Sequence, residues 1–278
     1  MSAVEQESEP KPGLIYYVDS IASPEHPESN HDVVFFDPNS ETAMVLHGVS
    51  PVDSYARNGA VIAQRVIAPE LAKISDPFVT LGFLSGILEE ASDEIRRKTH
   101  GFSSTTATVI KLFPFSQESM SQFVVMNIGD GLALKLGAPD GHKEITQETF
   151  YNPPYANHIM EAARGILNFV ETPQEAQRLP EQFRYLLLNR GRFAAHLGQR
   201  YRTRPDIQGG MLFQGGRIGI FSPGVGHNLK SGEIFELMQE NQPAQAITRE
   251  AHRMASRKDH PRAFPSDISA IVIEHPKR

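Results

Sequence analysis

Two histidines and one aspartate lie at the ends of apolar segments in the first fifth of the chain. His31 and Asp32 precede one apolar run, and His47 follows a buried strand expected over residues 42–46. Because Gly48 allows a sharp turn and a close backbone approach, His47 is predicted to face a ligand. Imidazole and carboxylate groups together suit Zn²⁺ or Fe. The alternative is that these are hydrogen-bonded polar residues that hold no metal.

Other polar residues offer weaker chemistry. Ser104, Thr105 and Thr106 are hydroxyl residues, but no base or orienting acid lies near them in the sequence, which argues against nucleophilic catalysis. Asp130 stands between two glycines, where it is predicted to stabilise a turn through its own side chain.

Composition narrows the class of protein. The chain has 27 Lys and Arg against 33 Asp and Glu, a net charge of −6, which argues against nucleic acid or an anionic membrane as a partner. Cysteine is absent, so thiol catalysis and thiolate metal sites are excluded. The first residues are polar and acidic, without the apolar core of a signal peptide, and no apolar run is long enough to span a membrane. A cytoplasmic location is expected.

Apolar periodicity and turn residues predict the elements. Strands are expected at 14–18, 33–36, 42–46, 106–113, 122–128, 132–136, 211–213, 218–221 and 267–274, with 122–136 forming a meander and 211–221 a strand pair. Helices are expected from Ser54, a candidate cap, through Ile67, then at 79–98, 233–240 and 243–257, with Ser231 as another cap. Further helical patterns occur around Ile159 and from Glu181 to Leu197.

This order of elements predicts an α+β fold with four layers, α-β-β-α, in which two antiparallel sheets are flanked by helix pairs. Residues 1–12 are expected to be a disordered lead-in, and residues 13–278 a single domain with a helical insertion around 152–204.

The order and spacing of several motifs resemble those of the metal-dependent protein phosphatases, the PPM or type 2C family. The resemblance covers about residues 14–274, although no single motif decides it. Its motifs are Asn30-His-Asp32 before a strand, the His47-Gly48 turn, Ser104-Thr-Thr-Ala107, Asn127-Ile-Gly-Asp-Gly131, Arg217-Ile-Gly-Ile-Phe-Ser-Pro-Gly224 and Ser266-Asp-Ile-Ser-Ala-Ile-Val-Ile273.

The resemblance implies a protein serine/threonine phosphatase that uses two Mg²⁺ or Mn²⁺ ions held by carboxylates. Asp32 and Gly48 retain the family's residues. The bridging Asp of the family is His47 here, its Glu is His31, and the Asp of its Ser-Asp-Gly motif is Pro223. The phosphate-binding Arg expected before Asn30 is missing.

The closing motif raises a question of register. The alignment that keeps the last apolar residues matched gives Ser266 the ligand position, whereas a shift of one residue would give it to Asp267. The first alignment is preferred, so Ser266 is counted as a degenerate position, as is Pro223. His31, His47 and Asp267 remain weak candidate ligands beside Asp32 and Gly48, and no catalytic residue is assigned.

Three function classes follow. The first, preferred, is a pseudophosphatase that needs no cofactor and binds a protein partner such as a phosphoprotein or kinase. The second is an active phosphatase with a remodelled Mg²⁺ or Mn²⁺ site. The third is a metal-independent hydrolase, for which no nucleophile–base pair is visible.

The sequence also predicts what replaces the metal. A protonated imidazole beside a carboxylate is stabilised, so His47 and Asp32 are expected to form a metal-free polar pair. Replacing His47 with Asp is then expected to cost on the order of 1 kcal/mol in a partly solvated site.

Overall fold

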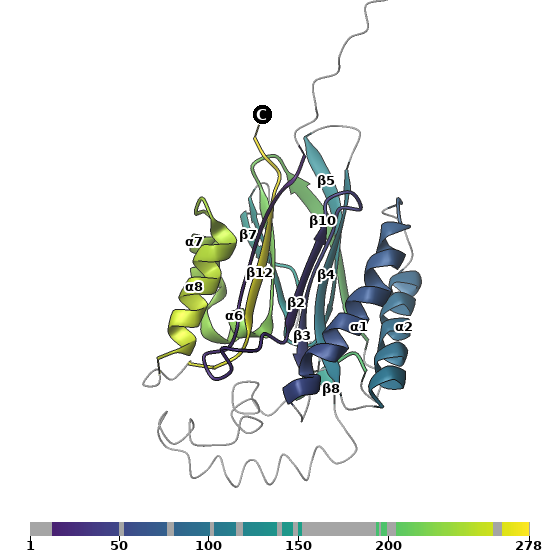
Figure 1. Ribbon diagram of the computed structural model, residues 1–278. Helices are drawn as coiled ribbons and strands as arrows, with labels where there is room; N and C mark the ends of the chain where they lie inside the picture. The colour runs from purple at the N-terminus through teal and green to yellow at the C-terminus, as the bar shows by residue number, and fades with distance from the viewer. Residues whose placement is uncertain are drawn as a thin grey trace, which may run out of the picture.

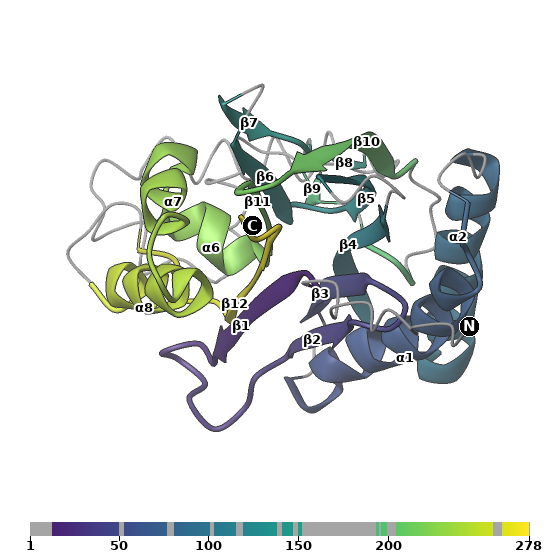
Figure 2. The ribbon, with the colours of Figure 1, turned by 90° about the horizontal axis from the view of Figure 1, so that it is seen from above.

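A computed structural model describes residues 13–49, 53–76, 81–100, 103–114, 119–137, 141–146, 150–151, 193–194, 196–198, 204–257 and 263–277. The predicted four-layer α+β sandwich is confirmed. Two antiparallel sheets pack face to face, with α1 and α2 on one outer side and α6, α7 and α8 on the other (Figures 1 and 2). None of the described helices is long and apolar enough to cross a membrane.

The first sheet has the strand order β1-β12-β11-β6-β7. Its strands are β1 (Ile15–Ile21), β12 (Ile268–Glu274), β11 (Arg217–Phe221), β6 (Leu132–Gly137) and β7 (Gly141–Glu144). Its outer face is covered by α6 (Pro223–Asn228), α7 (Ser231–Leu237) and α8 (Pro243–Ala255).

The second sheet has the order β10-β5-β4-β3-β2. Its strands are β10 (Asp206–Phe213), β5 (Met120–Ile128), β4 (Ser104–Pro114), β3 (Thr42–Val49) and β2 (Asp32–Asp37). It is covered by α1 (Asp53–Ala72) and α2 (Leu81–Thr99). A separate two-stranded sheet pairs β8 (Phe150–Tyr151) with β9 (Phe193–Ala194).

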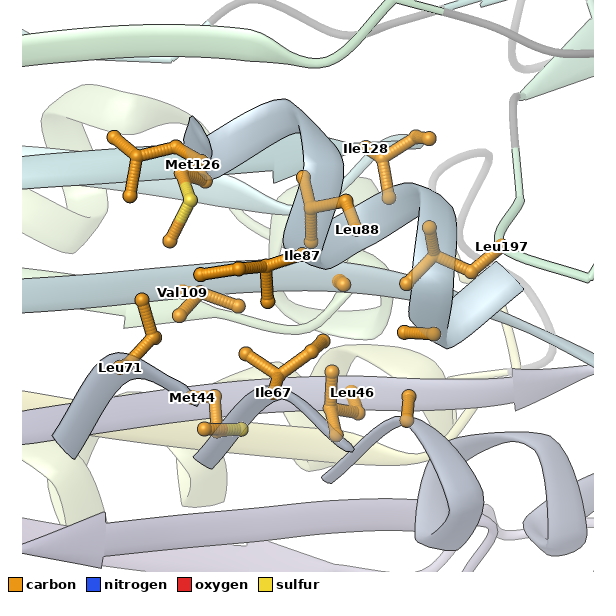
Figure 3. Close-up of a cluster of buried hydrophobic side chains, with 14 of the residues drawn as sticks. Met44, Leu46, Ile67, Leu71, Ile87, Leu88, Val109, Met126, Ile128 and Leu197 are labelled. Atoms are coloured by element: carbon orange, nitrogen blue, oxygen red, sulfur yellow. The ribbon is translucent and has the colours of Figure 1, made fainter. Parts of the chain in front are cut away.

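The central strands are buried on both faces. On β3, Met44 and Leu46 join the cluster beneath the helices, while Ala43 and Val45 join the cluster between the sheets. Figure 3 shows the first of these clusters, in which side chains of α1 and α2 interlock with those of β3, β4 and β5. This period-2 alternation decides which positions face the interior of the sandwich, and therefore which residues can meet at its end.

Two expected strand pairs are wrong. Strands β10 and β11 do not pair with each other, because β10 joins β5 in one sheet and β11 joins β6 and β12 in the other. Strands β5 and β6 likewise lie in different sheets. An apolar pattern with a short turn fits a hairpin and a crossing between packed sheets equally well, so it could not distinguish them.

Several boundaries also differ from the predictions. Strand β3 does not end at His47-Gly48 but continues to Val49, because both residues pair with β4. Helix α1 begins before Ser54, and α7 begins at Ser231, with Lys230 as its N-cap. The short helix α6 was not anticipated.

The expected insertion around 152–204 lies largely outside the described residues, as do the helical pattern around Ile159 and the lead-in 1–12. Where the structure describes the insertion, the helical run predicted to reach Leu197 is wrong. Residues 193–194 form β9, and Leu197 makes an isolated antiparallel bridge with Thr105.

Candidate functional site

The site is organised around a contact between two neighbouring strands. The antiparallel register of β2 and β3 places Asp32 opposite His47. Both positions continue the alternation that turns Val34 and Val45 toward the other sheet, so both side chains face the interior of the sandwich. His47 Nδ1 and Asp32 Oδ1 are 2.6 Å apart, with 19% of the His47 side chain exposed and none of the Asp32 side chain. The predicted polar pair is present.

The third residue of the site, Asp267, comes from the other sheet and lies close to Asp32 and His47. It immediately precedes β12, and its Oδ1 and Oδ2 accept hydrogen bonds of 2.8 Å from the backbone N–H groups of Ser23 and His31. Ligand atoms of Asp32, His47 and Asp267 all lie within 4.8 Å of one another. One carboxylate from the first sheet therefore faces a carboxylate and an imidazole from the second.

The assignment of Ser266 to the ligand position is wrong, because Asp267 is the residue that reaches the other two. On β12, Ile271 and Ile273 face between the sheets, while Ile268 and Val272 face the helices. Asp267 precedes Ile271 by four residues, so the alternation of the strand turns its side chain toward the same inner face. Since residues 268–273 are all buried, the apolar pattern could not reveal which face was which.

Pro223 lies between two residues that approach the backbone of Asp267. Its neighbour Ser222 donates a hydrogen bond of 3.2 Å from Oγ to the backbone carbonyl of Asp267. A Cβ at the next residue, Gly224, would lie 2.1 Å from that carbonyl oxygen, so α6 approaches the start of β12 as closely as a glycine allows. Pro223 is the first residue of α6, and its ring offers no ligand atom.

The two remaining sequence candidates are peripheral to this group. The ring of His31 places Nδ1 3.6 Å from Asp267 Oδ2 and Nε2 3.2 Å from Ser29 Oγ, and the residue contacts Asp267 mainly through its backbone N–H. Gly48 has the opposite parity to His47 and faces α1, where a Cβ would lie 2.2 Å from the carbonyl oxygen of Ala56.

Replacing Gly48 with Ala is therefore expected to destabilise the fold by about 1–3 kcal/mol, because α1 must move away from β3. Chemical denaturation measures the change in unfolding free energy. Gly86→Ala is the matched control, because nothing lies within 4 Å of a Cβ there and the substitution is expected to be neutral or slightly stabilising in a helix. Equal stability of the two variants would contradict the close packing of α1 on Gly48.

The charges around His47 favour its protonated form. Burial acts to lower the pKa of His47, but the charge and hydrogen bond of Asp32, with the charges of Asp267 and Asp130, outweigh it and raise the pKa to about 9. The pKa of Asp267 is raised by burial and by Asp32, and this rise is opposed by His47 and by the amides of Ser23 and His31. In this cluster the positive charge of His47 therefore offsets part of the negative charge of Asp32 and Asp267.

Two histidines that the sequence did not single out lie near this cluster. The carboxylate of Asp130 is buried, and its Oδ2 lies 3.3 Å from His227 Nε2, so Asp130 has a long-range contact beyond the local turn role predicted for it. Burial, and to a smaller extent His47, lower the pKa of His196 to about 4, although Asp130 opposes this, so His196 is neutral at physiological pH. His227 lies one helical turn after Pro223, which is the signal that could have identified it.

The raised pKa of His47 predicts how stability depends on pH. The unfolded value is the ordinary 6.5, so the pair stabilises the fold fully below about pH 6.5 and is lost as the pH rises through about 9. The full effect is on the order of 3 kcal/mol. Unfolding measured from pH 6 to 10 should show this loss in the natural chain and not in His47→Asn, with His252→Asn as a control. Parallel curves for the natural chain and His47→Asn would contradict the pair.

The residues present do not fit a pair of Mg²⁺ or Mn²⁺ ions. Such ions prefer oxygen ligands, and two of them need several carboxylates to offset their charge. Here one of the three grouped ligands is an imidazole, and the ring of Pro223, which stands where the resemblance expects an Asp, offers no ligand atom.

No protein-family model and no curated protein matches the sequence of this chain. Solved structures do match its fold. PppA of Pseudomonas aeruginosa, described as a key regulatory component of T6SS, is 12% identical with a TM-score of 0.65, over 94% of this chain and 97% of that one. The serine/threonine phosphatase PstP/Ppp of Mycobacterium tuberculosis is 16% identical with a TM-score of 0.64, over 95% and 99%.

The catalytic domain of PstP in complex with two manganese ions is 15% identical with a TM-score of 0.63, over 94% of this chain and 97% of that one. The resemblance predicted from the sequence motifs is thus confirmed for the fold: this chain has the fold of the PPM-type Ser/Thr phosphatases.

Proposed function

We propose that this chain is a pseudophosphatase of the PPM type, a non-catalytic protein that acts by binding a protein partner. The observation that carries the proposal is the 2.6 Å contact between His47 Nδ1 and Asp32 Oδ1. In the resemblance drawn from the sequence, the position of His47 belongs to the Asp that bridges both metal ions. An imidazole bonded to the neighbouring carboxylate leaves that bridge without its central ligand.

The electrostatics of the site support a loss of phosphoryl chemistry. Two-metal phosphatases use the cations to bind phosphate and to lower the pKa of a bound water. Here the carboxylates of Asp32, Asp267 and Asp130 surround a single protonated His47. Such a cluster does not attract a phosphate dianion, so we propose that the partner is recognised through its protein surface. A regulatory role accords with the description of PppA, which shares this fold.

A phosphatase assay tests the proposal. Purified protein is incubated with a phosphothreonine peptide and with p-nitrophenyl phosphate, in the presence of Mg²⁺, Mn²⁺ or Zn²⁺. The expected rate equals that of the Asp32→Ala variant in every metal. Hydrolysis that depends on Mn²⁺ and disappears in Asp32→Ala would overturn the proposal.

The second candidate function is an active metal-dependent Ser/Thr phosphatase with a remodelled site. The observation that favours it is the grouping of Asp32, His47 and Asp267 within 4.8 Å, at the end of a fold shared with a manganese-bound phosphatase domain. The same assay distinguishes the two candidates, because only the second predicts turnover that is sensitive to Asp32→Ala.

A further inference from the structure

One buried oxygen in the cluster lacks a partner. Asp32 Oδ1 contacts His47, but Asp32 Oδ2 is buried and has no hydrogen-bond partner among the described residues. The Asp32 side chain is fully buried, and a buried carboxylate oxygen without a partner is costly. Such an atom, in a residue that groups with His47 and Asp267, indicates that the site binds a ligand.

The donor set indicates which ligand. Two carboxylates and one imidazole are the ligand types used by Zn²⁺, whereas Mg²⁺ prefers oxygen donors alone. With no ligand atom in the proline ring next to Asp267, the three grouped residues suffice for one cation and fall short of two. By the motif resemblance this group stands at the place of the phosphatase metal centre, and its residues suit a different number and kind of cation.

The geometry needs little adjustment. Zn²⁺ bonds nitrogen and oxygen at about 2.0–2.2 Å, so ligand atoms around it lie roughly 3–4 Å apart. The observed group spans at most 4.8 Å, and its shortest separation is 2.6 Å, so shifts of an ångström or less would suffice. The amides of Ser23 and His31 already fix the orientation of Asp267, as outer partners do at metal sites, and leave its oxygens further lone pairs.

We propose that Asp32, His47 and Asp267 bind a single Zn²⁺ ion at the end of the sandwich, with release of the His47 imidazole proton to solvent, in place of the two-ion centre of the phosphatases that share the fold. This site joins β2 and β3 of one sheet to the start of β12 in the other, so the bound ion would hold the two sheets together. The proposal does not depend on whether the chain hydrolyses phosphate.

Metal binding is measured directly on the full chain. After treatment with a chelator and its removal, the protein is titrated near neutral pH with Zn²⁺, Mn²⁺ or Mg²⁺ by calorimetry, and bound metal is counted after equilibrium dialysis. We expect one tight Zn²⁺ per chain, and Mn²⁺ and Mg²⁺ at least tenfold weaker. Asp32→Asn, His47→Asn and Asp267→Asn should each weaken Zn²⁺ binding by about tenfold or more.

His31→Asn is the matched control, since it removes an imidazole beside Asp267 that lies outside the three-residue group. It should retain the tight site. A Co²⁺ absorption spectrum with an imidazole signature that is lost in His47→Asn provides a second measurement on folded protein. Absence of tight Zn²⁺ binding, two equivalents of Mn²⁺, or tight Zn²⁺ binding that survives His47→Asn would each overturn the proposal.

Discussion

His47→Asp is expected to be one of the two most destabilising single changes at the site when metal is removed by a chelator. The substitution places a new carboxylate against that of Asp32, whose side chain is fully buried, with Asp267 in the same group. Breaking a buried ion pair and adding a like charge cost about 3–5 kcal/mol. This exceeds the value expected from the sequence, because the sequence suggested a partly solvated site and the structure shows a buried one.

The effect of His47→Asp should depend on pH in a direction that identifies its cause. Like-charge repulsion raises the folded-state pKa of the clustered carboxyls above their unfolded values, so the folded state binds additional protons as the pH falls. The variant should therefore be closest in stability to His47→Asn, which lacks both the cation and the added acid, near pH 5 and furthest from it near pH 8. Urea unfolding at both pH values measures this difference.

His47→Asn and His252→Asp are the controls. The first removes the cation without adding a like charge and should cost less at pH 8, and the second adds an acid on α8, away from the site. If His47→Asp were as stable as the natural chain in chelator at pH 8, His47 would be an ordinary polar replacement and not the counter-ion of Asp32.

Much of this architecture could be predicted from the sequence because apolar periodicity and turn residues are local signals. They located most strands and the long helices, and the motif order gave the fold. The partners of each strand could not be predicted, since a short turn between apolar runs also occurs where the chain crosses from one packed sheet to the other. This is why β10 and β11 were expected to pair although they lie in different sheets.

In the candidate site, too, local contacts could be predicted from the sequence and contacts made by tertiary packing could not. The contact of His47 with Asp32 could be predicted because both lie on consecutive strands that pair directly. The role of Asp267 was assigned to Ser266 because β12 is buried on both faces, so its apolar residues carry no inward–outward signal. His196 and His227 are brought near Asp130 and His47 by tertiary packing, which no local pattern encodes.

Asp267→Ala is expected to release the segment that precedes β2. In the natural chain the two oxygens of Asp267 accept the backbone N–H groups of Ser23 and His31, so one carboxylate connects the end of one sheet to the chain entering the other. Its loss leaves two amides without their acceptors and leaves His47 with one acid fewer. Relief of repulsion with Asp32 offsets part of this, and a net cost of about 3–5 kcal/mol is expected.

Hydrogen exchange at individual amides can separate the loss of this anchor from a general loss of stability. In Asp267→Ala, hydrogen exchange at Ser23 and His31 should accelerate by about tenfold or more beyond any change at the centre of β4. Asp267→Asn keeps one acceptor oxygen, so its exchange rates at Ser23 and His31 should lie between those of the natural chain and those of Asp267→Ala. Ser266→Ala changes the neighbouring residue, whose side chain lies outside the group, and should cost less than about 1 kcal/mol. If Asp267→Ala matched Ser266→Ala in both stability and exchange, the carboxylate would not be what ties the two sheets together at this end.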